Sequence, residues 1–403
     1  MIRLYDLLEA SNGQPFGEPA AHIFTDFCLD SRRAAEGQLY VALKTDRGDT
    51  HQFMREAVAN GVIGILCTNP PEFDTQGISV VIVKDTEAAL MAWARYILNK
   101  TGIQVIGVAG TSGKSVTVRA INQVLSTRYS VLIDPGTARG RLGLPLALAQ
   151  LNSEHEFVVL ELSPNYPGEM ADMVQTLQPD TGIITNVGHA HTDMFTNVEE
   201  ITRETRVLVE RLTPNGLAVL NYDDDNIREM ANATRGRVVT VGMERFGADL
   251  MAYNVMVGLT KTGFDLRYKG ERYVGRWTPL LGKHQLYGVL AGLAVGLHYD
   301  TPIASALQAI TEMAYLPGRM HPLPGINNSV LIDDSYTANP QSALAALNWV
   351  QVVNEERATT DQRRVIFVMG DMDNLGSYSQ YGHRLVGHRA AEVADLIVTN
   401  GHD

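Results

Sequence analysis

The segment from Val105 to Ser115 constrains the fold more than any other stretch of this chain. An apolar run at residues 105–108 leads into a turn at 110–115 that reads Gly-Thr-Ser-Gly-Lys-Ser, and a helical pattern follows through 120–125. Glycines let backbone N–H groups approach a polyphosphate closely, and the N-terminus of the next helix attracts negative charge. A strand that enters a helix through such a turn predicts a phosphate-binding loop in an α/β sheet.

Two side chains of this turn have the chemistry that a nucleotide requires. Lys114 would reach the β- and γ-phosphates, and the Ser115 hydroxyl would bind Mg²⁺. The strict eight-position motif has glycine where this chain has Val108, because the glycines here fall at 107, 110 and 113. An ordinary strand–helix turn is the alternative, but such turns seldom carry Gly-Lys-Ser, so the pattern favours nucleotide binding.

The rest of the chain alternates short apolar runs with helical patterns. Strands are expected at residues 38–43, 64–67, 79–83, 104–108, 157–160, 181–185, 216–221, 329–333, 364–369 and 396–399. Helices are expected at 86–96, 198–212 and 286–297, and antiparallel strands within 251–277. Apolar strands that alternate with helices predict an α/β fold built on a mostly parallel sheet.

The length of 403 residues predicts two or three domains. A polar stretch at 99–102 precedes a new strand, and a segment rich in proline and glycine runs through 316–325. These features predict domains at 1–99, 100–318 and 319–403. Because a doubly wound domain rarely ends after two or three strands, the third is expected to be a partial, Rossmann-like domain.

Composition excludes several classes of protein. The chain has 45 acidic and 33 basic residues and a net charge of −12, which argues against broad nucleic-acid binding. Asp6 and Glu9 interrupt the N-terminus too early for a signal peptide, and the apolar stretch at 286–297 is too short to span a bilayer. Two cysteines without metal-site spacing fit a reducing compartment. We therefore expect a cytoplasmic protein without membrane insertion. A monomer is expected as well, although the sequence does not establish the oligomeric state.

Three motifs spread along the chain resemble those of the Mur ligase family. They are the loop at 110–115, Asp-Ser-Arg at 30–32 and Leu-Pro-Gly-Arg at 316–319. The resemblance implies an ATP-dependent, amide-forming ligase of peptidoglycan precursor synthesis. It also implies three domains: one for a UDP-sugar substrate, a central ATPase domain with the phosphate loop, and a mobile C-terminal domain for the incoming amine.

Two further motifs are similar to one branch of that family. Glu161-Leu162 with Pro-Gly-Glu at 167–169 is the first, and Asp-Asp-Ser-Tyr-Thr-Ala-Asn-Pro at 333–340 is the second. This branch joins D-alanyl-D-alanine to a UDP-N-acetylmuramoyl tripeptide through an acyl phosphate. The resemblance thus implies a UDP-muramyl peptide and a dipeptide as substrates, with ATP and Mg²⁺ as cofactors.

The resemblance also assigns site residues. Catalytic roles fall on Lys114, His191 and Arg319. ATP contacts fall on Gly110, Thr111, Ser112, Gly113, Lys114, Ser115, Val116, Arg319, Asp334 and Asn339. Mg²⁺ ligands fall on Ser115, Glu161 and His191, and substrate contacts on Ser31, Arg139 and Arg141. The chemistry is consistent, because a guanidinium group can donate two hydrogen bonds to phosphate oxygens and a carboxylate accepts hydrogen bonds from ribose hydroxyls.

Glu161 and His191 follow neighbouring strands, so both are expected at the edge of the sheet that carries the phosphate loop. An isolated histidine is more often structural, but its place at a strand end beside that loop favours a site role. His189 is the weaker of the two nearby histidines and is equally explained as a turn cap.

The chain departs from the family pattern at several places besides its short third domain. Thr205 occupies the position of a lysine that is carbamoylated in the family and bridges two metal ions. Either Arg203 or Arg206 replaces the second cation, or both lie on a solvated helix face. Gly288 stands where an asparagine is usual. Finally, residues 136–141 carry arginines in place of several asparagines, which would favour an anionic acceptor.

These departures leave two alternatives to the D-alanyl-D-alanine branch. One is a Mur-like ligase that uses another acid or amine. The other is a non-catalytic relative that retained ATP binding after losing the lysine.

Overall fold

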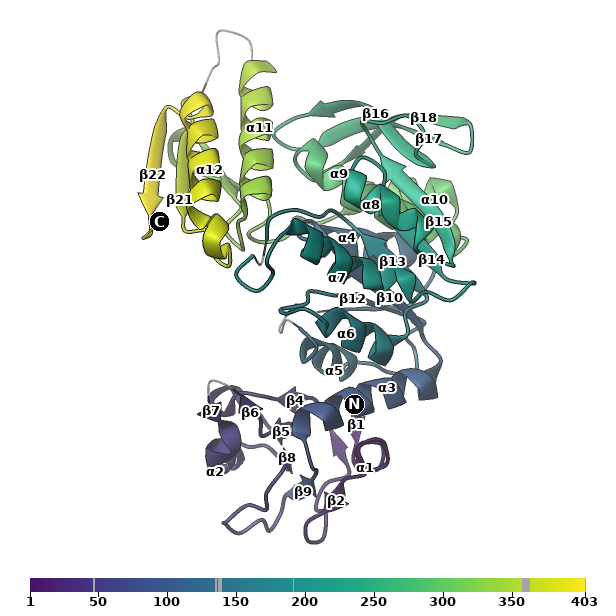
Figure 1. The fold of residues 1–403 in the computed structure, drawn as a ribbon, viewed down its shortest axis with the longest axis vertical. Coiled ribbons are helices and arrows are strands. Elements are labelled where there is room, and N and C mark those ends of the chain that lie inside the picture. Colours follow the sequence, from purple (N-terminus) through teal and green to yellow (C-terminus); the bar gives the residue numbers. More distant parts are fainter. Residues whose placement is uncertain (46–47, 135, 137–139, 191, 357–362, 403) are drawn as a thin grey trace. The chain divides into compact units, whose positions relative to one another are not determined.

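The computed structural model describes residues 1–45, 48–134, 136, 140–190, 192–356 and 363–402 (Figure 1). The chain divides into two compact units. The first contains Met1–Val105, Leu132–Leu160 and Asp172–Gln178, and the second contains Ile106–Val131, Glu161–Ala171 and Pro179–Asp403. The three domain ranges expected from sequence stay a prediction.

The first unit is built on a small, mostly parallel sheet with the strand order β2-β9-β8-β5-β4. Only the β2–β9 pair is antiparallel. The strands are β2 (Gln14–Pro15), β4 (Phe27–Cys28), β5 (Leu39–Val41), β8 (Gly64–Cys67) and β9 (Ser79–Ile82). The free thiols of Cys28 and Cys67 lie in the core of this sheet, where burial raises the pKa of Cys67 to about 12.

Helix α3 (Thr86–Thr101) begins where the sequence predicts, because the Asp85 carboxylate accepts a hydrogen bond from Ala88 N at 2.9 Å. It packs against α1 (Leu4–Ser11). The remaining elements of this region are β1 (Ile2–Arg3), β3 (Ile23–Phe24), β6 (Lys44–Thr45), β7 (Gly48–Asp49), α2 (Met54–Ala59), β11 (Val131–Ile133) and α5 (Gly143–Leu148), with 3₁₀ turns at Ser31–Arg33 and Thr50–Phe53.

One large sheet has the strand order β11-β12-β10-β13-β14-β15-β16-β17-β18. Its strands after β11 are β10 (Gln104–Ala109), β12 (Phe157–Glu161), β13 (Thr181–Ile184), β14 (Leu217–Asn221), β15 (Arg237–Gly242), β16 (Leu250–Val257), β17 (Thr262–Tyr268) and β18 (Glu271–Thr278). Pairing is parallel from β10 through β13, β14 and β15 to β16, and antiparallel from β16 to β18. The expected parallel sheet and the antiparallel strands within 251–277 are both confirmed.

Two helices of the second unit, α4 (Lys114–Leu125) and α9 (Lys283–His298), pack with unusually close backbones. Gly288, Gly292 and Gly296 recur every fourth residue on one face of α9. A Cβ atom at Gly292 would lie only 2.7 Å from the carbonyl carbon of Ala120. Glycine at these positions therefore permits the contact. Other helices here are α7 (Val198–Glu210), α8 (Asp225–Glu229) and α10 (Ile303–Ala309), with 3₁₀ turns at Met230–Asn232 and Ile310–Glu312. Helix α6 (Glu169–Leu177) has residues in both units.

The last segment of the chain adds two small sheets and two long helices. Strands β19 (His321–Pro324) and β20 (Val330–Asp333) are antiparallel, whereas β21 (Ile366–Gly370) and β22 (Leu396–Asn400) are parallel. Helices α11 (Pro340–Glu356) and α12 (Ser379–Val393) lie side by side (Figure 1). Their shared core includes Leu347, Leu375 and Val386. This last segment also contains two 3₁₀ turns, Ile326–Asn328 and Gly376–Tyr378.

No helix in the described ranges is long and apolar enough to cross a membrane.

Candidate active site

The turn between β10 and α4 has the backbone of a phosphate-binding loop. Strand β10 ends at Ala109 and helix α4 begins at Lys114, which confirms the predicted order of strand, turn and helix, with the helix starting inside the segment expected as turn. Gly110 has a φ of 130°, and a Cβ there would lie 2.2 Å from Thr185 Oγ1 and 2.8 Å from the carbonyl oxygen of Asn186. Only glycine fits this position, because any side chain would separate the loop from the neighbouring strand end.

That neighbouring strand end, after β13, holds the loop with hydrogen bonds. The Asn186 side-chain oxygen accepts from Ser112 N at 2.8 Å and from Thr111 Oγ1 at 3.0 Å. Thr185 Oγ1 in turn donates to the carbonyl oxygen of Ser112 at 2.6 Å. Thr185 and Asn186 are positioning residues that sequence reasoning did not assign. The available signal was a pair of polar side chains directly after a buried parallel strand.

A further layer of contacts comes from the end of β14. The Asn221 amide donates to the carbonyl oxygen of Thr185 at 3.0 Å, and Asp224 Oδ2 accepts from Val187 N at 3.1 Å. The ends of β13 and β14 therefore form one hydrogen-bonded support beneath the loop. Such support fixes the geometry that phosphate binding requires.

The first turn of α4 presents Lys114, Ser115 and Val116 in different environments. Lys114 Nζ donates to the carbonyl oxygen of Gly110 at 2.8 Å, so its ammonium group lies over the loop. The Ser115 side chain is half-buried, whereas Val116 is buried and faces Gly288 of α9. Val116 can therefore contact a nucleotide only through its backbone N–H.

Glu161 lies at the end of β12, beside the strand that enters the phosphate loop. The next residue, Leu162, donates from its backbone N to the carbonyl oxygen of Val108 at 2.8 Å. The carboxylate of Glu161 and the hydroxyl of Ser115 are the hard oxygen donors that suit Mg²⁺. His191 and Arg139 lie outside the described residues. Within the described ranges, no cluster of three or more His, Cys, Asp or Glu side chains has metal-site geometry.

His189, the weaker of the two predicted histidines, contacts the last segment of the chain. Its ring stacks on that of Tyr378 with centroids 3.8 Å apart and an angle of 3° between the planes. Close by, Thr192 Oγ1 donates to the carbonyl oxygen of Leu375 at 2.6 Å. These contacts indicate that the His189 ring packs against the segment around Tyr378.

Asn339 reaches the phosphate loop directly. Its amide donates to Ser112 Oγ at 2.8 Å, across 227 positions of sequence. Its side-chain oxygen accepts from Ser342 N at 2.9 Å, which caps the start of α11. Asn339 thus links α11 to the loop, while its contact with ATP stays a prediction.

The two motifs predicted around Arg319 and Asp334 come together in the structure. The Asp334 carboxylate accepts from Met320 N at 3.0 Å, and burial raises its pKa to about 6. The guanidinium carbon of Arg319 lies 4.5 Å from the centre of the Tyr336 ring. The segments that carry the Arg319 guanidinium and the Asp334 carboxylate therefore lie together. The contacts of both side chains with ATP stay a prediction.

Comparison with known proteins identifies the family. The model of the Mur ligase middle domain matches residues 108–296, and that of the Mur ligase, glutamate ligase domain matches residues 318–403. The chain belongs to the Mur ligase family.

Individual relatives of this Mur ligase match it along nearly its whole length. The UDP-N-acetylmuramoyl-tripeptide–D-alanyl-D-alanine ligase of Escherichia coli (strain K12) is 29% identical over 397 residues, which cover 98% of this chain and 84% of that protein. The protein of the same name from Bacillus subtilis (strain 168) is 27% identical and covers 89% and 76%. A crystal structure of MurF from Acinetobacter baumannii superposes with a TM-score of 0.87 at 27% identity, covering 99% and 86%.

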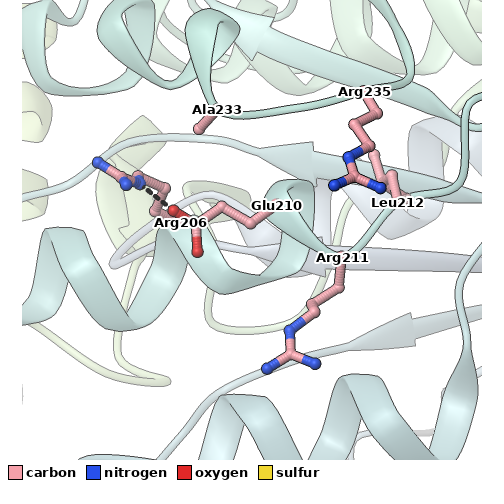
Figure 2. Close-up of a pocket in the computed structure, with 6 residues that line it drawn as sticks. All are labelled: Arg206, Glu210, Arg211, Leu212, Ala233 and Arg235. Carbon is pink, nitrogen blue, oxygen red and sulfur yellow. Dashed lines mark hydrogen bonds and ion pairs between the residues drawn. The ribbon is translucent and has the colours of Figure 1, made fainter.

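At the position of the family's carbamoylated lysine, this Mur ligase buries Thr205 on α7. Arg203 is exposed, and Arg206 is exposed and pairs with Glu210 one turn along the helix. Arg206 lines a surface pocket of about 480 Å³ together with Arg211 and Arg235; these side chains are drawn in Figure 2. These contacts favour the solvated-face explanation over replacement of a cation.

The glycine at 288 in this Mur ligase has a packing reason. A Cβ there would already lie 3.0 Å from Thr117 Oγ1 and from Val116 Cγ1, so an asparagine would force α9 away from α4. Nearby, burial lowers the pKa of His284 to about 4, which keeps its imidazole neutral.

The described substrate candidates of this Mur ligase already have protein partners. Ser31 is buried, and its hydroxyl donates to Glu56 at 2.8 Å. Arg141 pairs with Glu87 and lies 3.4 Å from Asp172. The positive charge of Arg141 is therefore largely balanced within the protein, and its role toward an anionic acceptor stays a prediction.

Proposed function

We propose that this chain joins D-alanyl-D-alanine to a UDP-N-acetylmuramoyl tripeptide, with cleavage of ATP to ADP and phosphate. The observation that carries the proposal is the similarity to the Escherichia coli ligase of that name, which extends over 98% of this chain. The supported phosphate loop and the carboxylate beside it supply the matching chemistry.

Positioning and charge stabilisation are the main tasks of the protein in such a reaction. The terminal carboxylate of the tripeptide attacks the γ-phosphate and gives an acyl phosphate and ADP. Lys114 and the backbone N–H groups of the loop would stabilise the charge on the phosphate oxygens. The amine of the dipeptide then attacks the acyl carbon, so that an amide forms and phosphate leaves.

The proposed metal ligands lie beside that loop. Bound Mg²⁺ would neutralise phosphate charge during transfer. Ser115 and Glu161 would bind the ion, and His191 is the third predicted ligand. From the other side, Arg319 would contact phosphate and Asp334 would accept from a ribose hydroxyl.

A non-catalytic ATP-binding relative is the second candidate, because Thr205 cannot carry a carbamate. A ligase for another acid or amine is the third, since Arg141 belongs to the segment that departs from the branch pattern. We further propose that the protein acts as a monomer in the cytoplasm and uses no nucleic acid.

Phosphate release across a panel of acceptors tests these candidates. Release that requires ATP, the UDP-muramyl tripeptide and D-alanyl-D-alanine together is expected. Release with a different acid or amine would instead support the altered-substrate ligase. Nucleotide binding without release for any acceptor would contradict the ligase proposal and support the non-catalytic relative.

A further inference from the structure

Glu204 is a buried carboxylate to which sequence reasoning gave no role. It lies on α7 next to Thr205 and is only 8% exposed. Burial of a charged group is costly unless hydrogen bonds compensate for the lost water. Both oxygens of Glu204 meet this need with backbone donors: Oε2 accepts from Gly168 N at 2.8 Å and Oε1 from Met170 N at 2.7 Å.

Those two donors stand at the N-terminus of α6, which begins at Glu169. The first N–H groups of a helix have no partner within it, and its positive end favours a negative charge. Glu204 therefore caps α6 from a different helix with two charge-assisted hydrogen bonds. A cap supplied across 34 to 36 positions of sequence holds the first residues of α6 against α7.

A second buried carboxylate holds the same segment from within. Glu169 is 2% exposed and accepts a hydrogen bond from Asn165 N. Between these points Gly168 has a φ of 94°, which allows the sharp turn into the helix. The loop at 162–168 is thus tied at its C-terminal end by two carboxylates.

Its N-terminal end is tied to the central sheet immediately after Glu161. Leu162 is fully buried and donates to the carbonyl oxygen of Val108. The backbone that carries the Glu161 carboxylate is therefore continuous with a short loop fixed at both ends. A shift of α6 would be transmitted through this loop to Glu161.

We propose that Glu204 is a positioning residue that holds the segment 161–170, and through it the Glu161 carboxylate, in the orientation for metal–nucleotide binding. The inference rests on the proposed function, in which Glu161 binds Mg²⁺. Glu204 acts through the backbone, because both of its carboxylate oxygens already accept hydrogen bonds from α6.

Glu204→Gln is the primary test, since it preserves size while placing an amide NH₂ against one of the two backbone donors. Glu210→Gln is the matched control, because Glu210 lies on the same helix and its carboxylate pairs with Arg206 at the surface. Calorimetric titration of Mg²⁺ into each protein with bound ADP measures metal affinity. Hydrogen exchange reports the protection of the Gly168 and Met170 amides.

For Glu204→Gln, about 5- to 10-fold weaker Mg²⁺ binding is expected, together with at least about 10-fold faster exchange at those two amides. The control should change neither. Glu204→Asp, whose shorter carboxylate retains the charge, should recover part of both losses and serves if the glutamine variant folds poorly. A lower melting temperature with unchanged Mg²⁺ affinity would overturn the proposal, as would unchanged exchange.

The two proposals fail in different ways. If the unaltered protein releases no phosphate with any acceptor, the ligase function is wrong, yet metal titration and exchange still decide the role of Glu204. If phosphate release is normal and Glu204→Gln binds Mg²⁺ as tightly as the unaltered protein, only the role of Glu204 is rejected.

Discussion

Lys114 concentrates the chemistry of the phosphate loop in one side chain. Its ammonium group already lies over the loop, where it donates to the carbonyl oxygen of Gly110. A phosphate bound to the loop would exchange that neutral acceptor for a charged one, which makes a stronger hydrogen bond. The largest effect of a single substitution is therefore expected here.

Replacing Lys114 with alanine should lower kcat for ATP-dependent phosphate release at least about 100-fold, because one charge-stabilising donor is lost. Steady-state kinetics measure the effect. Arg119→Ala is the control, since Arg119 is an exposed cation on the same helix. Equal rates for the Lys114 variant and the unaltered protein would refute the assigned role.

Asp334 should make stability depend on pH. Burial raises its pKa to about 6 from an ordinary 3.8, so the folded protein binds a proton more readily than the unfolded chain. The stability that this proton contributes is present below pH 3.8 and is lost as the pH rises through 6. Compared with Asp334→Asn, the unaltered protein should lose up to about 2–3 kcal/mol of unfolding free energy between pH 4 and 7.

Urea denaturation of both proteins at several pH values measures this difference. Parallel stability curves would show that Asp334 does not titrate differently in the folded chain.

At the scale of elements, helices α4 and α9 pack closely because α9 has glycines, which carry no side chain, at the contact. Gly292→Ala should destabilise the protein by about 1–3 kcal/mol, because the new Cβ would meet the backbone of Ala120 and push the helices apart. Denaturant unfolding measures the loss.

The matched control is Gly387→Ala on α12, where a new Cβ meets nothing within 4 Å. There the alanine should be neutral or stabilise by up to about 1 kcal/mol, since glycine is a poor helix former. Similar losses at the two glycines would contradict the packing argument.

Elements with strong local signals were predictable from the sequence. The strand, turn and helix around Lys114 follow from apolar periodicity and glycine spacing, and the start of α3 at Thr86 agrees with the helix expected from residue 86. The contacts that hold the site were not predictable, because they join distant positions. The hydrogen bond from Asn339 to Ser112 and the cap that Glu204 supplies to α6 each join residues far apart in the sequence. No periodic pattern in the sequence indicates such contacts.

The site residues divide in the same way: residues in sequence motifs could be proposed from the sequence, and residues whose role depends on strand order could not. Asp334 and Arg319 were proposed from motifs, and the structure brings their segments together, although their roles toward ATP stay a prediction. Thr185 and Asn186 were missed because their importance depends on which strand lies next to β10 in the sheet. Strand order is set by packing of the whole sheet, so no short window of sequence contains it.

For the whole molecule, nucleotide binding should stabilise the fold by linkage. A non-hydrolysable ATP analogue with Mg²⁺ at 100 times its dissociation constant should add about 2.7 kcal/mol to the unfolding free energy. Thermal unfolding of the full chain with and without the analogue measures this gain. At the same concentration Lys114→Ala should show a smaller gain, and an equal one would mean that the analogue binds away from the loop.

The core of the first unit offers one practical consequence for spectroscopy. Cys28 and Cys67 are the two cysteines of the sequence, and both are buried, with thiols that resist deprotonation at neutral pH. A cysteine introduced at an exposed position, such as Arg119 or Gly387, should therefore react with maleimide dyes far faster than either native thiol. Fluorescent labels for following movement during turnover can be attached to the native background without first removing its cysteines.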